Sequence, residues 1–303
     1  KVTSSTGKGG GIYCYRGTIS DEGFSSYIQY NEATMGGGLY FGDVSTTINI
    51  IRGWALNIIY NKAIATASNQ KAYGGNLYVA KYGTLTYSSE NASACLNIEY
   101  GQAISSYSYA YGGGVYSLGT IECEINVNNN IVKGGTGNNL GYGAGVCVAG
   151  GTFNINARYV SFGHNNAYKG YGGGLAILGG NVTLNLNYSE YNSWCSKIAY
   201  NDAGYGAGVY IQSGIFKFLA GYIGCYGVNL NANEDSDRKY GKSNLAAYEG
   251  GGLAVFGGTV YLNGGYIQYN HTTGGSYGGV YKRSGTIYYN GTQISSNTPN
   301  NRN

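Results

Sequence analysis

The sequence predicts an all-β fold, a single parallel β-helix of about nine coils with three short strands in each coil. Two observations predict it. A glycine-rich motif recurs nine times along the chain, and each copy is followed by short segments in which apolar and other residues alternate with period two. Helical periodicity is absent. Because a solenoid grows along one axis around one core, residues 1–303 are expected to form one domain.

The recurring motif, here called the anchor, is typified by Gly-Gly-Gly-Ile12-Tyr13. Its period-two pattern indicates a strand with Ile12 and Cys14 on one face and Tyr13 on the other. Glycines just before a strand allow a sharp corner and a close approach of two backbones. The coils start near residues 9, 36, 74, 112, 143, 172, 206, 250 and 278.

Two further segments follow each anchor. The second begins near a Gly-Thr pair such as Gly17-Thr18, and the third closes with an asparagine. The clearest closing residues are Asn31, Asn61, Asn130, Asn270 and Asn297. Stacked coils would align these amides in a hydrogen-bonded ladder. The coils differ in length, and we expect the extra residues between the closing asparagine and the next glycine run, with the longest insertion at 228–249.

Stacking in register predicts two columns on the anchor strands. The inward column is aliphatic and supplies the core. The outward column is rich in tyrosine, and we expect it to serve self-association or glycan contact. Its tyrosines are Tyr13, Tyr40, Tyr78, Tyr116, Tyr210 and Tyr281.

The anchors, the Gly-Thr pairs and the closing asparagines resemble the right-handed parallel β-helix superfamily. They are most similar to the Gly-Gly-Gly-Ile-Tyr repeat arrays of large microbial surface proteins and adhesins, and to polymorphic outer-membrane proteins. The resemblance covers Gly9 to Asn297, although Tyr or Ile often stands where the latter family has Phe. It implies a right-handed solenoid in an extracellular or cell-surface location.

The six cysteines can be sorted by their place in the coils. Cys95 and Cys123 are about one coil apart, as are Cys195 and Cys225, so each pair is a disulfide candidate. Cys14 and Cys147 are four coils apart, on the order of 19 Å, and cannot bridge within one chain. We expect Cys14 to be a buried thiol and Cys147 to face outward, where it is able to bond to another chain.

Other candidate sites are few. Matches to the N-glycosylation signal occur at Asn91, Asn181, Asn187, Asn270 and Asn290. The one dense charge cluster, within the longest insertion, includes Glu234, Asp235, Asp237 and Arg238. It is typical of a solvated loop, with a calcium site or a partner contact as alternatives.

Composition excludes several classes of protein. A net charge of +4, from 18 basic and 14 acidic residues, is too small to indicate a nucleic-acid partner. No apolar run is long enough to span a membrane as a helix. The two histidines, His164 and His271, lack ligand spacing, so no metal or other cofactor is expected. Carboxylates do not recur at stacked positions, so we assign no catalytic residue and predict a protein that is not an enzyme.

The sequence therefore predicts an extracellular structural protein. It would be a protomer that associates with itself, end to end and laterally, in a filament or surface assembly. The alternatives are a glycan-binding adhesin stalk and a β-helix polysaccharide lyase or hydrolase. No capping helix is expected at either end, which favours a piece of a longer array or protomers that cap one another, with unrecognised caps as a third possibility.

Overall fold

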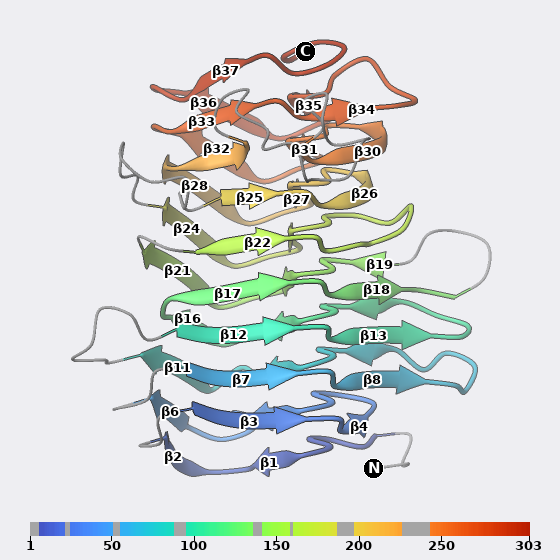
Figure 1. The fold of residues 1–303 in the computed structure, drawn as a ribbon, viewed down its shortest axis with the longest axis vertical. Helices are drawn as coiled ribbons and strands as arrows, with labels where there is room; N and C mark the ends of the chain where they lie inside the picture. Colours follow the sequence, from blue (N-terminus) through green and yellow to red (C-terminus); the bar gives the residue numbers. More distant parts are fainter. Residues whose placement is uncertain are drawn as a thin grey trace.

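The computed structural model describes residues 6–21, 25–50, 55–87, 95–135, 141–157, 160–186, 197–225 and 243–303. These residues form 37 strands and no helix. The strands stack as successive coils into a rod, with the two ends of the chain at opposite ends of it (Figure 1). The all-β, nine-coil solenoid predicted from the sequence is confirmed.

Three nine-stranded parallel sheets run the length of the rod. The first sheet contains β1 (Ile12–Cys14), β5 (Leu39–Phe41), β10 (Leu77–Val79), β15 (Val115–Ser117), β20 (Val146–Val148), β23 (Leu175–Ile177), β27 (Val209–Ile211), β31 (Leu253–Val255) and β35 (Val280–Lys282). The second contains β2 (Gly17–Asp21), β6 (Thr46–Ile50), β11 (Gly83–Tyr87), β16 (Thr120–Glu122), β21 (Thr152–Ala157), β24 (Asn181–Leu186), β28 (Ile215–Ala220), β32 (Thr259–Leu262) and β36 (Thr286–Tyr289). The third contains β3 (Ser25–Gln29), β7 (Ala55–Ile59), β12 (Cys95–Glu99), β17 (Ile125–Asn128), β22 (Ser161–Gly163), β25 (Lys197–Ala199), β29 (Tyr222–Gly224), β33 (Tyr266–Gln268) and β37 (Gln293–Ser295).

Register places equivalent residues of successive coils above one another. On the first sheet Leu39 pairs with Leu77 and Tyr40 with Tyr78, and the next coil continues both columns. The aliphatic column lies in the main core, together with the inward residues of the other two sheets. Burial of these apolar side chains is the main favourable contribution to folding.

A further group of strands, which the sequence analysis did not predict, lies beside the third sheet; we call it the flap. Its outgoing strands are β4 (Glu32–Ala33), β8 (Lys62–Ala65), β13 (Gln102–Ser105) and β18 (Ile131–Lys133), and its return strands are β9 (Ala72–Tyr73), β14 (Ala110–Tyr111) and β19 (Gly141–Tyr142). In later coils the flap consists of β26 (Asp202–Tyr205), β30 (Leu245–Glu249) and β34 (His271–Thr272). In Figure 1 the labels β8, β13 and β18 mark it at the right of the rod. A thin second core made almost entirely of alanine fills it, since small side chains let the outgoing and return strands approach closely.

Each of the three anchor glycines is required for a different structural reason, as the second coil shows. Gly36 has φ +60°, which turns the chain from the flap into the first sheet. A Cβ on Gly37 would collide with the backbone carbonyl of Lys62 in the flap. A Cβ on Gly38 would lie 2.7 Å from the Nδ2 atom of Asn61. The anchor is therefore the point where the first sheet, the flap and the closing asparagine meet.

The closing asparagines form the predicted amide ladder. The Nδ2 atom of Asn165 donates to the Oδ1 atom of Asn201 in the next coil at 3.0 Å and to the carbonyl oxygen of Val127 at 2.9 Å. The Oδ1 atom of Asn165 accepts hydrogen bonds from both the Nδ2 and the backbone N–H of Asn130. The column is Asn31, Asn61, Asn76, Asn130, Asn165, Asn201, Asn244, Asn270, Asn297 and Asn301. Its interior members are fully buried and pair with one another and with the backbone, as burial of a polar group requires.

In the third coil, the closing asparagine and the third anchor glycine have exchanged places. Gly101 stands where other coils have the closing asparagine, and Asn76 stands where they have the third anchor glycine. The Asn76 side chain takes the vacant ladder position, donating from Nδ2 to Asn130 and accepting from Asn61. A Cβ on Gly101 would lie 2.5 Å from that Nδ2 atom. The ladder thus stays continuous, because in this coil the anchor supplies the amide in place of the closing residue.

The expected single site of insertion is wrong. Extra residues follow the ladder asparagine in coils two to four, where the flap is longest, but they also occur elsewhere. Residues 88–94 and 187–196 separate second-sheet from third-sheet strands, and residues 226–242 separate β29 from Asn244. Coil length therefore varies at more than one corner, and connections between strands in general tolerate insertions better than a packed core does.

Residues 298–303 lie across the ninth coil. Asn297 donates from Nδ2 to the Oδ1 atom of Asn301, which continues the ladder. The backbone N–H of Val280 donates to the carbonyl oxygen of Asn301 at 2.7 Å. This segment therefore satisfies backbone groups along β35.

Candidate functional site

The tyrosines of the anchor strands lie on the outer face of the first sheet, as predicted, but most are not on the surface. Tyr40 is 3% exposed and Tyr116 is 8% exposed, and Tyr78 and Tyr210 are also buried. The expectation that this column forms an open contact surface is therefore wrong for these four residues. Tyr13, in the first coil, is exposed, and Tyr281 is partly exposed.

A second tyrosine column covers the first. It consists of the residues directly before the anchor glycines, and its members Tyr73, Tyr111, Tyr142, Tyr171 and Tyr205 are half-buried. The ring centroids of Tyr73 and Tyr116 are 4.9 Å apart, and those of Tyr171 and Tyr210 are 4.8 Å apart. The sequence signal was present as a repeated Tyr-Gly before the anchor strand, but its meaning depends on the flap, which brings these rings over the first sheet.

The second column and its apolar neighbours form a half-buried surface along the rod, here called the aromatic stripe. Along the column, adjacent rings lie nearly parallel, as for Tyr142 and Tyr171 with centroids 4.8 Å and planes 13° apart. The stripe consists of Met35, Tyr73, Tyr111, Leu118, Tyr142, Ala149, Tyr171, Leu178, Tyr205 and Phe256. Continuous apolar surfaces of this kind are typical of interaction sites.

Burial changes the pKa of tyrosines in the anchor column and in the aromatic stripe. Burial raises the pKa of Tyr78 and of Tyr142 to about 12, and it also raises the pKa of Tyr116 and Tyr210. The cause is that the phenolate loses its hydration in an apolar surrounding. These residues are thus held as neutral phenols.

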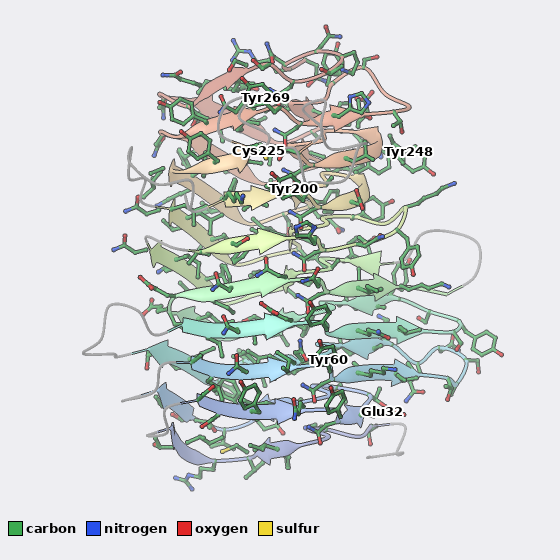
Figure 2. All side chains as sticks on the ribbon, in the orientation of Figure 1. Glu32, Tyr60, Tyr200, Cys225, Tyr248 and Tyr269 are labelled. Atoms are coloured by element: carbon green, nitrogen blue, oxygen red, sulfur yellow. The ribbon has the colours of Figure 1, made fainter. Side chains whose placement is uncertain are left out.

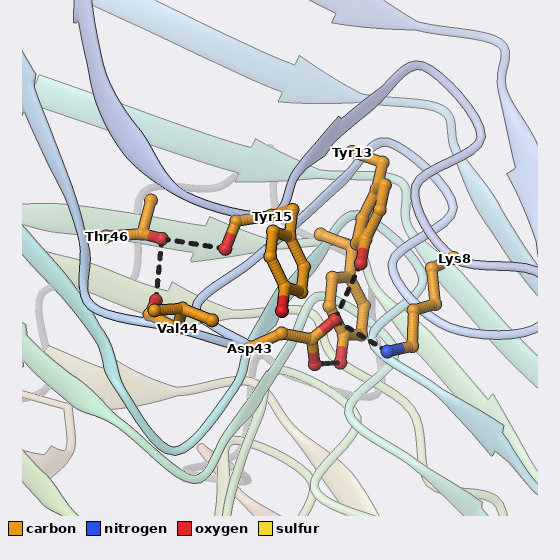
Figure 3. Close-up of polar contacts among 7 residues, drawn as sticks. Lys8, Tyr13, Tyr15, Asp43, Val44 and Thr46 are labelled. Atoms are coloured by element: carbon orange, nitrogen blue, oxygen red, sulfur yellow. Dashed lines mark hydrogen bonds and ion pairs between the residues drawn. The ribbon is translucent and has the colours of Figure 1, made fainter.

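A polar cluster joins the first two coils at the start of this surface (Figure 3). The carboxylate of Asp43 accepts hydrogen bonds from Lys8 at 2.6 Å, Tyr13 at 2.8 Å and Tyr40 at 2.5 Å. Burial alone would raise the pKa of Asp43, but these hydrogen bonds outweigh it and hold the pKa below the ordinary value of 3.8. The stabilisation is present above that value and is lost as the pH falls through the lowered pKa. With three donors on one carboxylate, the cluster is suited to clamping coils rather than to proton transfer.

A third tyrosine column, here called the exposed column, precedes the ladder. Tyr30, Tyr60 and Tyr100 stack on one another, and Tyr200 and Tyr269 occupy the same place in later coils. Figure 2 shows Tyr60, Tyr200 and Tyr269 along one side of the rod, where the third sheet meets the flap. The recurring Tyr-Asn pair in the sequence could have predicted this column, but only its asparagine was interpreted.

The cysteines differ from expectation. Cys147 is completely buried beside the anchor tyrosines, so its outward, intermolecular assignment is wrong, and burial raises the pKa of its thiol. Cys14 is half-buried against the core, less deeply than predicted. Cys225 is a free thiol, which contradicts its predicted bond to Cys195, a residue outside the described ranges. The described residues contain no disulfide; the side chain of Cys95 lies outside the description, so its pairing with Cys123 stays a prediction.

The glycosylation candidates separate into three groups. Asn270 is a buried ladder residue whose amide is engaged in hydrogen bonds, so its assignment as an acceptor is wrong. Asn181 and Asn290 are exposed, and their modification stays a prediction. Asn91 and Asn187, like the loop residues Glu234, Asp235, Asp237 and Arg238, lie outside the described residues.

Within the described ranges, no group of three or more His, Cys, Asp or Glu side chains is arranged to hold a metal ion. In the same part of the chain no helix is long and apolar enough to cross a membrane. Comparison with family models, with curated proteins and with solved structures found no match to this chain. The stacked parallel sheets define this chain as a β-solenoid repeat protein.

Proposed function

We propose that this chain is a structural protein of the extracellular space or cell surface. It acts as a rod that associates with copies of itself in a filament or surface layer. The proposal rests mainly on the aromatic stripe, an apolar surface that extends along the rod axis on the outer side of the first sheet.

Stiffness is the first property that supports a structural role. Each coil is tied to the next in three sheets, and the asparagine ladder adds a buried fourth connection between coils. The clamp of Lys8, Tyr13 and Tyr40 around Asp43 adds a further connection between the first two coils. A regular hydrogen-bonded stack of this kind resists bending, since every displacement disturbs several connections at once.

The aromatic stripe supports lateral association in preference to glycan stacking. A sugar ring needs an open aromatic face, whereas the half-buried tyrosines of the stripe cover one another's faces along the rod. Their edges, together with Leu118, Leu178 and Phe256, present an apolar surface that a second rod would bury. Association end to end would extend the second and third sheets with further parallel strands at ~4.8 Å spacing. At the C-terminal end of the rod, residues 298–303 already pair with β35 at the edge of the first sheet.

Sedimentation velocity at rising protein concentration, combined with electron microscopy, tests this proposal. The wild-type chain should form larger species as its concentration rises. Leu178→Lys places a charge in the stripe and should abolish lateral assembly. Leu219→Lys is the matched control, because Leu219 is a partly exposed leucine on β28 of the second sheet, outside the stripe. A strict monomer at every concentration, or equal loss of assembly in both variants, would contradict the proposal.

A further inference from the structure

The exposed column places three phenols against one another at the surface. Tyr30 is 73% exposed, Tyr60 is 39% exposed and Tyr100 is 40% exposed. The ring centroids of Tyr30 and Tyr60 are 5.3 Å apart with planes 12° apart. Those of Tyr60 and Tyr100 are 4.6 Å apart with planes only 3° apart. Each of the three tyrosines comes from a different coil.

The backbone holds these tyrosines in an unusual conformation. Tyr30, Tyr60 and Tyr100 have φ values of +60°, +57° and +54°. Left-handed backbone costs roughly 1–2 kcal/mol for a residue with a Cβ, and glycine and asparagine adopt it most readily. Asn129 occupies this position in the fourth coil, so the fold accepts asparagine there. Tyrosine is therefore not needed for the turn itself, and its recurrence indicates a role for the exposed ring.

The stack restricts what that role can be. Both faces of the Tyr60 ring are covered, by Tyr30 on one side and by Tyr100 on the other. A planar or sugar ligand therefore cannot stack on Tyr60, and what remains open is the ring edge with its hydroxyl group. The edge carries the two carbon atoms ortho to the hydroxyl, which are the positions where tyrosyl radicals couple.

We propose that the exposed column is a site of oxidative cross-linking, in which Tyr60 couples to Tyr30 or to Tyr100 to form dityrosine. The oxidant is hydrogen peroxide acting through a haem peroxidase. This proposal is independent of self-association, because it concerns neighbouring coils of one chain.

The reaction balances as follows. Each of two phenols loses one electron and one proton, giving two tyrosyl radicals. The radicals pair through their ortho carbons to form one C–C bond, and both rings regain aromaticity by moving the ortho hydrogens to the phenol oxygens. Peroxide accepts the two electrons and two protons, its O–O bond breaks, and two molecules of water result.

Proximity favours coupling within the column over coupling between molecules. Groups held in contact react as if at a very high local concentration, whereas coupling between two chains depends on their encounter. Ladder asparagines directly follow Tyr30 and Tyr60 and fix their register, as in the hydrogen bond from the Nδ2 of Asn31 to Asn61 at 3.0 Å. After Tyr100, the backbone N–H of Gly101 donates to the ladder residue Asn130 at 2.8 Å. Coupling would thus convert a non-covalent contact between coils into a covalent one.

The buried anchor column does not offer the same chemistry. Tyr40 and Tyr78 are also stacked, with centroids 4.5 Å apart, but both are buried away from an enzyme in solution. The pKa of both phenols is raised mainly by burial, but the pKa of Tyr60 is also raised, by desolvation and by Tyr100 and Tyr30, so acidity does not separate the two columns. The two columns thus differ in access rather than in geometry.

Treatment of the dilute, purified chain with haem peroxidase and hydrogen peroxide tests the inference. Dityrosine fluorescence should appear in monomeric protein, and mass spectrometry of its peptides should show Tyr60 joined to Tyr30 or Tyr100. Tyr60→Phe removes one hydroxyl group and should abolish these peptides. Tyr107→Phe is the control for exposure, since Tyr107 is 65% exposed but belongs to no stack in the column, and it should leave them unchanged.

Circular dichroism of both variants would establish that they remain folded. The inference is overturned if monomeric protein yields no dityrosine, if its cross-links avoid Tyr60, or if Tyr60→Phe leaves their yield unchanged. Sedimentation of the untreated chain reports separately on self-association, so the failure of one proposal is distinguishable from the failure of the other.

Discussion

In the second and third coils, the exposed column and the anchor column are both tyrosine stacks with one ring in each coil, but one lies at the surface and the other is buried. Tyr60 and Tyr100 stack at 4.6 Å in front of the ladder, and Tyr40 and Tyr78 stack at 4.5 Å on the first sheet. The first pair is open to solvent, whereas the second lies beneath the aromatic stripe. The stacking distances along the rod are nearly equal in the two pairs. Their difference in exposure therefore arises from the segments that pack over each column.

An alternating strand pattern predicts which residues share a face of a strand, but it does not predict which other segments pack over that face. The flap places Tyr73 and Tyr111 over the anchor tyrosines, and this turns an outer sheet face into a second, aromatic core. Tyr30, by contrast, is 73% exposed and is the most exposed member of its column.

Removing a buried ring should be the most damaging change. Tyr116→Ala leaves a cavity between the anchor column and the stripe and should lower the free energy of unfolding by about 3–5 kcal/mol. Denaturation in guanidinium chloride, followed by circular dichroism, measures this loss. An effect below about 1 kcal/mol would show that Tyr116 is not covered in solution.

Breaking the ladder should come second. Asn165→Ala removes the acceptor of both the side-chain and backbone donors of Asn130, and a cost of about 2–4 kcal/mol is expected for these buried groups. Asn156→Ala is the matched control because Asn156 is exposed on the second sheet, and its cost should stay within about 0.5 kcal/mol. Equal losses in the two variants would argue against a buried amide ladder.

The exchange in the third coil offers a sharper test of the same ladder. Gly101→Asn introduces a Cβ that would lie 2.4 Å from the backbone carbonyl oxygen of Gly113 and 2.5 Å from the Nδ2 atom of Asn76, and it should cost about 1–3 kcal/mol. Adding Asn76→Gly removes the obstructing side chain and supplies the arrangement of the other coils, so the double variant should lose less than the single one. Thermal unfolding of the wild type, the two single variants and the double variant measures the coupling, and strict additivity would refute it.

Removing an exposed ring should be the mildest change. Tyr60→Ala loses stacking at the surface without creating a cavity, so we expect a cost below about 1 kcal/mol in the same guanidinium titration. A cost as large as that of Tyr116→Ala would mean that the exposed column contributes to the core, and the proposed contrast would be lost.

Much of the fold could be predicted because it depends on period and repetition. The inward Leu39 and Leu77, the outward Tyr40 and Tyr78, and the ladder through Asn61 all follow from one residue type recurring at one place in each coil. Asn76 was missed because it takes the ladder position from the anchor side, where a single sequence shows only a departure from Gly-Gly-Gly.

The candidate surfaces were harder to predict because exposure depends on contacts between segments. Cys147 alternates with inward residues and was assigned to the surface, yet it is completely buried. Asn270 matches a glycosylation signal, but its amide is part of the ladder. In both cases the local pattern is correct and the packing of the flap or of the neighbouring coil decides the outcome.

The most direct test of the buried aromatic layer is an alkaline titration that follows phenolate absorbance and circular dichroism together. Folding raises the pKa of Tyr78 and Tyr142 to about 12, so their stabilising contribution is complete below pH 10 and is lost as the pH rises through about 12. We predict that a large group of tyrosines ionises only as the β-sheet signal disappears. Complete ionisation of all the tyrosines near pH 10, with the β-sheet signal unchanged, would contradict the account.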